Sequence, residues 1–179
     1  QEQNIPVTSL PGPAACITAL TLSGLSTRRF CFEGFLPSDK KEKKEILEEL
    51  KEESRTIILY EAPHRLVRTL AELLETLGEP LLALCRELTK KFETVIPTTL
   101  KGALSIYEEE EPRGEYVLVL EGKSIECKKQ EEQERWQQLS VEEHVALYEN
   151  QGMSRKEAMK QAAMDRGISK REVYGYFIR

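Results

Sequence analysis

The sequence lacks the features that would direct the chain to a membrane or a secretory route. Its uninterrupted apolar runs are only a handful of residues long, as at Leu81–Cys85, whereas a membrane-spanning helix needs about 20 apolar residues. The first residues, Gln1–Asn4, are polar and show neither the basic nor the apolar region of a secretory signal. These absences predict a cytoplasmic protein.

Metal-ligating residues are also scarce. The four cysteines form no Cys-x-x-Cys pair, and the sequence holds only two histidines, so a structural zinc site is not expected. We predict no metal and expect Cys16, Cys31, Cys85 and Cys127 to be small reduced core residues. A net charge of −5 argues against a protein that coats nucleic acid along its whole length.

Apolar residues make up 40% of the 179 residues, which is sufficient for a folded core. Segments of β-branched and aromatic residues alternate with segments of helical periodicity, and the last two strands are separated by only a short helix. This order predicts an α/β three-layer sandwich with a mixed sheet. The expected strands are Val7–Leu10, Phe30–Phe35, Thr56–Tyr60, Leu81–Cys85, a stretch ending at Pro97, and Tyr116–Glu121. The expected helices are Ala14–Leu25 with Pro13 in its first turn, Lys40–Glu53 capped by Ser38 or Asp39, Pro63–Leu77 ending at Gly78, and a short helix from Thr98 or Thr99 to about Glu109.

The last third of the chain has a different composition. Residues 124–138 are dense in charge without an apolar stripe and are predicted to be a linker. Residues 139–179 are predicted to form a small unit of three helices, Ser140–Asn150, Ser154–Arg166 and Ser169–Phe177, each beginning at a serine cap. From residue 151 onward, seven basic residues stand against three acidic ones, with aromatic residues among them. This composition suits RNA binding, and it equally suits an appendage that docks on its own chain or on a second copy.

Three loops that follow predicted strands are candidate sites. The turn Leu10–Ala15 leads into a helix, the segment Tyr60–Arg65 opens another, and Cys85–Lys90 follows a central strand. Purely structural explanations stay open for all three. The first can be a tight turn without ligand, the second a charged first helical turn, and the third a surface ion pair.

Five short motifs carry a family resemblance. They are Leu-Pro-Gly-Pro-Ala-Ala (10–15), Phe-Glu-Gly-Phe-Leu-Pro (32–37), Tyr-Glu-Ala-Pro-His-Arg (60–65), Arg-Glu-Leu-Thr-Lys (86–90) and Arg-Gly-Glu-Tyr-Val-Leu-Val (113–119). In this order they resemble the tetrapyrrole methylases, and within them the bacterial small-subunit ribosomal RNA (cytidine-2′-O)-methyltransferases. The second and third motifs distinguish these RNA enzymes from the porphyrin and corrin methylases.

The resemblance implies S-adenosylmethionine as cofactor, small-subunit ribosomal RNA as substrate and a homodimer. Carried over by motif, the positions that line the cofactor are Pro13, Ala14, Ala15, Glu61, Leu88, Gly114 and Glu115. Because a ribose hydroxyl is a weak nucleophile that benefits from a nearby base or charge, Glu87 and Lys90 are the catalytic candidates. His64, Arg65 and Arg86 are expected to orient the RNA.

The resemblance also implies that the chain begins where the second subdomain of the family begins. On this interpretation residues 1–10 belong to the segment between subdomains and residues 11–123 form the second α/β subdomain. The chain would then supply about half of the cofactor site, bind cofactor poorly by itself and not turn over. A tetrapyrrole C-methyltransferase and a non-catalytic module for RNA binding or dimerisation are the alternatives.

Overall fold

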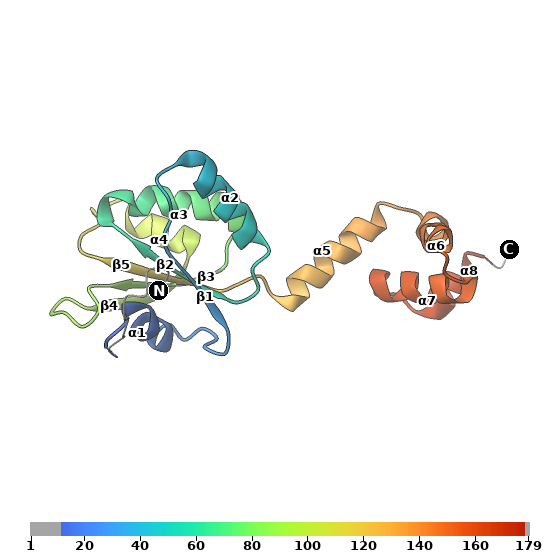
Figure 1. The fold of residues 1–179 in the computed structure, drawn as a ribbon, viewed down its shortest axis with the longest axis horizontal. Helices are drawn as coiled ribbons and strands as arrows, with labels where there is room; N and C mark the ends of the chain where they lie inside the picture. The colour runs from blue at the N-terminus through green and yellow to red at the C-terminus, as the bar shows by residue number, and fades with distance from the viewer. Residues whose placement is uncertain (1–11, 178–179) are drawn as a thin grey trace, which may run out of the picture. The chain divides into compact units, whose positions relative to one another are not determined.

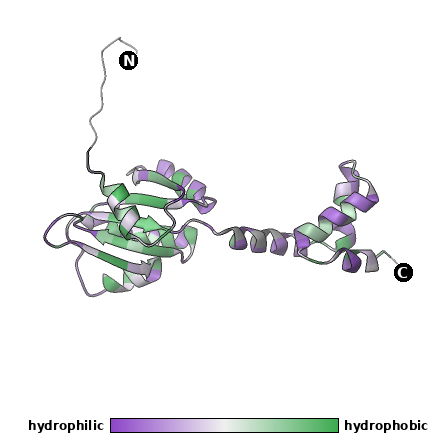
Figure 2. Ribbon diagram, turned by 90° about the horizontal axis from the view of Figure 1, so that it is seen from below, coloured by the Kyte–Doolittle hydropathy of each residue, from purple (hydrophilic) through white to green (hydrophobic). Residues whose placement is uncertain are grey.

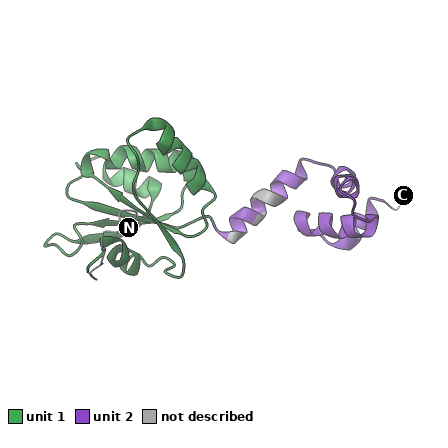
Figure 3. Cartoon of the chain, viewed as in Figure 1, with its two compact units in different colours: residues 1–123 green, residues 124–179 purple. Residues whose placement is uncertain are grey.

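The computed structural model describes residues 12–177 and divides the chain into two compact units, residues 1–123 and residues 124–179 (Figure 3). The strand expected at Val7–Leu10 lies outside the described residues. Within the described part, every helix is too short or too polar to cross a bilayer.

The first unit is built on a five-stranded sheet in the order β1-β2-β5-β3-β4 (Figure 1). Its strands are β1 (Phe30–Phe35), β2 (Thr56–Glu61), β3 (Leu81–Arg86), β4 (Thr94–Thr99) and β5 (Tyr116–Leu120). β1 and β2 are parallel, whereas β5 runs antiparallel to both of its neighbours, β2 and β3. The predicted mixed sheet is therefore confirmed. Because β2 and β3 both oppose β5, their carboxyl ends meet at the same edge of the sheet.

Helices cover both faces of this sheet, which confirms the three layers. The helices α2 (Lys40–Lys51), α3 (Pro63–Leu77) and α4 (Leu100–Ile106) lie on one face, and α1 (Ala15–Leu22) lies on the other (Figure 1). On the α3 side, Leu66 and Leu70 pack with Leu59 of β2 in the larger core. On the α1 side, Ala19 and Leu20 pack with β-strand residues in a smaller core. Figure 2 shows that the strands are mostly apolar, whereas α2 is largely polar.

Local signals set most helix ends. Asp39 caps α2 by accepting hydrogen bonds from the backbone N–H groups of Lys41 and Glu42, and α3 ends at Gly78, as predicted. The first helix is shorter than expected and begins at Ala15, so Pro13 precedes the cap residue and is not a helical residue. Pro97 lies within β4 rather than at its end. β4 is an edge strand, where a missing N–H is tolerated.

The second unit is wholly helical. It contains α5 (Ile125–Gln137), α6 (Val141–Asn150), α7 (Arg155–Arg166) and α8 (Lys170–Gly175). The predicted serine caps are confirmed, because Ser140, Ser154 and Ser169 each form a capping box with the glutamate three residues later. The segment expected to be a linker is instead the helix α5, and Cys127 on it is exposed rather than part of a core.

Candidate active site

Several of the predicted site residues meet at one edge of the sheet, which we call the carboxyl edge. Glu61 at the end of β2 and Arg86 at the end of β3 both pair with Tyr116, the first residue of β5. The N-terminus of α1 reaches the same edge, because the backbone N–H of Cys16 donates to the hydroxyl of Tyr60 at 3.1 Å. The carboxyl edge therefore brings together the turn before α1, the loop after β3 and the loop before β5.

The two loops are joined by a cluster of three charged side chains, Glu87, Lys90 and Glu115. The Lys90 ammonium donates to Glu87 Oε1 at 3.2 Å and to Glu115 Oε2 at 3.0 Å. The backbone N–H of Glu115 donates to Glu87 Oε1 at 2.9 Å, and the N–H of Glu87 donates to the carbonyl of Glu115 at 3.0 Å. This reciprocal bonding fixes the loop after β3 against the loop before β5.

Backbone geometry shows that this contact is specific. Glu87 has a φ of +52° and Gly114 a φ of +85°, so both lie in the left-handed region, which is unfavourable for a residue with a side chain. A Cβ atom at Gly114 would lie only 2.6 Å from Glu87 Oε1. Glycine at 114 is therefore what allows the Glu87 carboxylate to approach.

The charges of the cluster are mutually stabilised. The hydrogen bond from the Glu115 backbone lowers the pKa of Glu87, and the neighbouring Lys90 ammonium lowers it further. The hydrogen bonds to Glu115 and Glu87 raise the pKa of Lys90. A carboxylate with a lowered pKa is a weaker base, so the geometry favours a charge-stabilising role for this cluster over proton abstraction.

The predicted residues of the segment 60–65 face in different directions. The carboxylate of Glu61 is fully buried and accepts hydrogen bonds from the Ala62 N–H at 2.8 Å and the Thr69 hydroxyl at 2.5 Å. Arg65 lies 3.4 Å from Glu61 Oε1 and donates to the carbonyl of Leu36 at 2.7 Å, so it holds the loop after β1. His64 is exposed on the first turn of α3. The side chains of Glu61 and Arg65 thus stabilise the carboxyl edge through internal hydrogen bonds. His64, in contrast, is accessible to a substrate.

Arg86 differs from these residues because one of its donors is unused. Its Nε atom is buried and has no hydrogen-bond partner among the described residues. Nearby, the hydroxyl of Tyr116 bonds the hydroxyl of Tyr107 and the N–H of Arg113, both at 3.1 Å. A buried unpaired guanidinium donor is a suitable partner for a carboxylate or a phosphate.

The structure adds aromatic residues that the sequence analysis did not select. The ring of Tyr60 packs edge-on against Phe32 and Phe35, with centroid distances of 4.9 and 5.7 Å. Phe32 and Phe35 are nonetheless 47% and 58% exposed. They share a face only because the pairing register shifts between Phe32 and Gly34, where the φ of Gly34 is +65°. The Phe-Glu-Gly-Phe spacing was the available signal, since glycine within a strand often marks a bulge.

These residues fit the cofactor that the family resemblance implies. The aromatic rings and the exposed small residues Pro13, Ala14 and Ala15 suit an uncharged adenosine. Leu88 packs at the rim of the core beside α1, on the same side.

Comparison with known proteins gives one family. Residues 1–104 match the tetrapyrrole (corrin/porphyrin) methylases. The chain is 48% identical over 168 residues to "Ribosomal RNA small subunit methyltransferase I" of Bacillus subtilis, covering 94% of the chain and 57% of that protein. Proteins of the same name in Halalkalibacterium halodurans and Synechocystis are 42% and 39% identical, over 98% and 97% of the chain and 60% and 61% of their own lengths.

The chain therefore spans about three fifths of the length of these curated relatives. Among solved structures, the methyltransferase CobJ aligns with a TM-score of 0.46 and 23% identity, covering 63% of this chain and 49% of CobJ. That likeness is too distant to bear on function.

Proposed function

The chain belongs to the tetrapyrrole methylase family, and from this premise we propose that it forms part of a methyltransferase that uses S-adenosylmethionine to methylate small-subunit ribosomal RNA, at the ribose 2′-oxygen of a cytidine. The names of the relatives support the RNA substrate. The observation that carries the proposal is the convergence of the Glu87–Lys90–Glu115 cluster and the Phe32–Phe35–Tyr60 rings at one edge of the sheet. We assign this protein to the cytoplasm, where ribosomal subunits are assembled.

In this proposal the chain mainly positions its ligands. When bound, the cofactor supplies an activated methyl group on a sulfonium, so the protein has to hold donor and acceptor in line. Pro13, Ala14 and Ala15 line the cofactor with the backbone at Glu61, while Leu88, Gly114 and Glu115 line it from the facing loops. The Lys90 ammonium, held by Glu87, stabilises the negative charge that develops on the ribose oxygen, and the hydroxyl proton that the methyl group replaces passes to water. His64 and Arg86 contact the RNA, and Arg65 orients the loop beside them.

The experiment is a methyl-transfer assay with a chimera in which this chain replaces the matching 168 residues of the Bacillus subtilis relative. The chimera is expected to transfer labelled methyl groups to small ribosomal subunits. Lys90→Ala is expected to lower the rate about 100-fold, the usual loss on removing a donor to a developing oxyanion. Lys91→Ala, which removes the neighbouring exposed charge, is the matched control and should stay within about twofold. Methylation of uroporphyrinogen instead of RNA would support the tetrapyrrole C-methyltransferase alternative and overturn the proposal.

A second candidate function, RNA binding by the helical unit, is favoured by the way its charges are distributed. The acidic side chains of α7 and α8 are all engaged: Glu157 and Glu172 in capping boxes, and Asp165 by the Tyr148 hydroxyl at 2.6 Å. Five basic residues are exposed and take part in no ion pair between described residues: Arg155, Lys156, Lys160, Lys170 and Arg171. The exposed surface of these helices therefore carries an excess of positive charge.

Deletion of residues 139–179 tests this second function. The salt dependence of RNA binding should become shallower, because each lost phosphate contact lowers the slope of log K against log salt by about 0.7 on single strands. An unchanged slope would indicate that the unit docks on protein instead. We also propose a homodimer, on the family resemblance alone. Sedimentation equilibrium of the chimera would show a monomer if this is incorrect.

A further inference from the structure

A basic cavity lies at the opposite end of the sheet from the carboxyl edge. It has a volume of about 600 Å³ and is lined by Arg28, Arg29, Phe30, Glu53, Ser54 and Arg55. Arg28 and Arg29 directly precede β1, and residues 53–55 directly precede β2. Because β1 and β2 are parallel neighbours, their amino ends meet here, and the Thr56 N–H donates to the Arg29 carbonyl at 3.2 Å. We call this cavity the arginine pocket.

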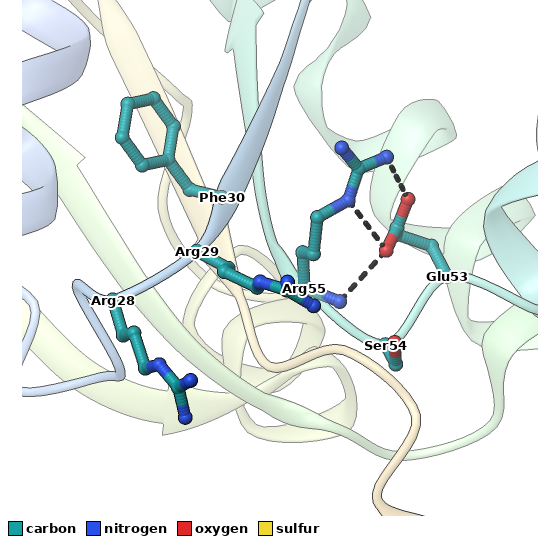
Figure 4. Close-up of a pocket in the computed structure, with 6 residues that line it drawn as sticks. All are labelled: Arg28, Arg29, Phe30, Glu53, Ser54 and Arg55. Atoms are coloured by element: carbon teal, nitrogen blue, oxygen red, sulfur yellow. Dashed lines mark hydrogen bonds and ion pairs between the residues drawn. The ribbon is translucent and has the colours of Figure 1, made fainter.

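One of the three arginines is neutralised within the pocket. The Arg55 guanidinium forms a two-pronged pair with the Glu53 carboxylate, whose Oε1 also accepts the Arg55 backbone N–H at 2.7 Å (Figure 4). This bonding lowers the pKa of Glu53 to about 2, so the pair stays charged and closed at neutral pH. Glu53 is thus occupied by Arg55 and does not balance the other two arginines.

Arg28 and Arg29 carry the pocket's excess positive charge. Both are exposed, and neither takes part in an ion pair between described residues. Figure 4 shows the Arg29 side chain extending toward Arg55 and the Arg28 side chain extending away from it, with the Phe30 ring pointing away from both. Two successive arginines without counter-ions that line one pocket offer guanidinium N–H donors of the kind that bind a phosphate group.

The backbone at the rim of the pocket is firmly held. The Lys123 N–H donates to the Glu53 carbonyl at 2.7 Å, and a Cβ at Gly122 would lie 2.2 Å from the Arg55 carbonyl oxygen. The segment that leaves β5 therefore packs tightly against residues 53–55. A rigid rim means that a ligand meets a pocket whose shape is already formed.

We propose that the arginine pocket binds a phosphodiester of the RNA substrate, at a distance from the reacting nucleotide. Six-residue strands at about 3.3 Å per residue place the pocket about 17 Å from the carboxyl edge. The bound phosphate therefore belongs to a nucleotide several positions from the methylated ribose. This inference rests on the proposed function for the identity of the ligand. Its chemistry, a phosphate group held by two guanidiniums, is independent of methyl transfer.

The test measures binding of a 15-nucleotide single-stranded RNA to the 179-residue chain by fluorescence anisotropy, without cofactor. The double variant Arg28→Ala/Arg29→Ala is expected to weaken binding about tenfold and to make the salt dependence shallower. The matched control, Lys40→Ala/Lys44→Ala on α2, removes the same charge from exposed positions and should change the affinity less than about twofold. Glu53→Gln, which frees Arg55 while keeping an acceptor, is expected to tighten binding.

The outcomes separate the possible ligands. Equal weakening by the two double variants would show a general charge effect and overturn the proposal. Saturable binding of inorganic phosphate that depends on Arg28 and Arg29, with unchanged RNA affinity, would assign the pocket to a small anion and also overturn it. Arginine-dependent RNA binding by a chain whose chimera transfers no methyl group would leave this proposal standing and remove the proposed function.

Discussion

Gly114 is the single residue on which the Glu87–Lys90–Glu115 cluster depends most directly. Gly114→Ala would strain a backbone at φ +85° and press a methyl group against the Glu87 carboxylate. We expect a loss of about 2 kcal/mol in the free energy of unfolding, measured by urea denaturation. Gly24→Ala is the matched control, because Gly24 has a φ of +74° with open space around it, and should cost only about 1 kcal/mol. Equal losses of stability in the two variants would mean that the contact of residue 114 with Glu87 does not add to the cost of Gly114→Ala.

Glu61 is expected to be important for stability rather than for direct ligand contact. Glu61→Gln removes the negative charge that faces Arg65 at 3.4 Å and leaves one acceptor oxygen fewer in a fully buried position. We predict a loss of about 2 kcal/mol on urea denaturation. Glu75→Gln on the exposed side of the same helix should change the stability by less than about 0.5 kcal/mol. An unchanged free energy of unfolding in Glu61→Gln would show that this network is not needed for the fold.

Charge is the property that sequence predicts least well at the scale of single residues. Arg166 counts as one of the basic residues of the tail, yet it donates to His144 Nδ1 at 3.1 Å and to the carbonyls of Leu139 and Ser140. It is a structural residue, because its donors are used inside the helical unit. A sequence gives the number of charges, whereas their availability depends on contacts between segments far apart in the chain.

Among the elements, α1 depends on a partner from the sheet. It has no side-chain cap of its own, and the Tyr60 hydroxyl accepts the N–H of Cys16. Tyr60→Phe keeps the ring but removes this acceptor, so we predict a destabilisation of about 1 kcal/mol and faster hydrogen exchange at Cys16 and Ile17. Tyr176→Phe, at an exposed position, is the control. Unchanged exchange at Cys16 would show that the hydroxyl does not hold the helix.

The helices of the second unit meet around a buried histidine. His144 stacks on Trp136 at 3.9 Å, accepts a hydrogen bond from Arg166, and lies 3.4 Å from Asp165, which the Tyr148 hydroxyl also bonds. Burial lowers the pKa of His144 below its ordinary value of 6.5, and the Arg166 charge lowers it further. The folded unit therefore holds His144 neutral.

This arrangement predicts a pH dependence with a definite sign. Because the unfolded chain takes up the proton first as the pH falls, the unit has its full stability above about pH 6.5 and loses stability below it. The chain's one tryptophan, Trp136, reports unfolding by fluorescence between pH 7.5 and 5.5. His144→Gln should make the stability of the unit less dependent on pH, whereas His64→Gln should leave this dependence unchanged. A wild-type stability that is constant over this range would contradict the prediction.

Local signals explain which elements could be predicted. Asp39, Gly78 and the three serine caps mark helix ends through contacts within a few residues, and these predictions are confirmed. α5 was missed because it carries no apolar stripe. The order of the strands could not be predicted from the sequence either, because β5 pairs between β2 and β3 through contacts between distant segments. The same holds for the site: its loops were predicted, but the Phe32–Tyr60 contact depended on a bulge.

At the scale of the whole first unit, the two ends of one sheet suit different ligands. The carboxyl edge offers aromatic rings and small exposed residues, which suit the methyl donor. The arginine pocket offers two unpaired guanidiniums, which suit a phosphate. The rigid strands between them fix the separation of the two sites, and so set which phosphate of an extended RNA can be bound.

The most direct test of the carboxyl edge is hydrogen–deuterium exchange of the chimera with and without S-adenosylhomocysteine, after calorimetry has shown that the ligand binds. We expect slower exchange at residues 13–16, 60–61, 87–90 and 114–115, and no change at residues 28–30 or 53–55. Protection at residues 53–55, or bound ligand without protection along the carboxyl edge, would contradict this expectation.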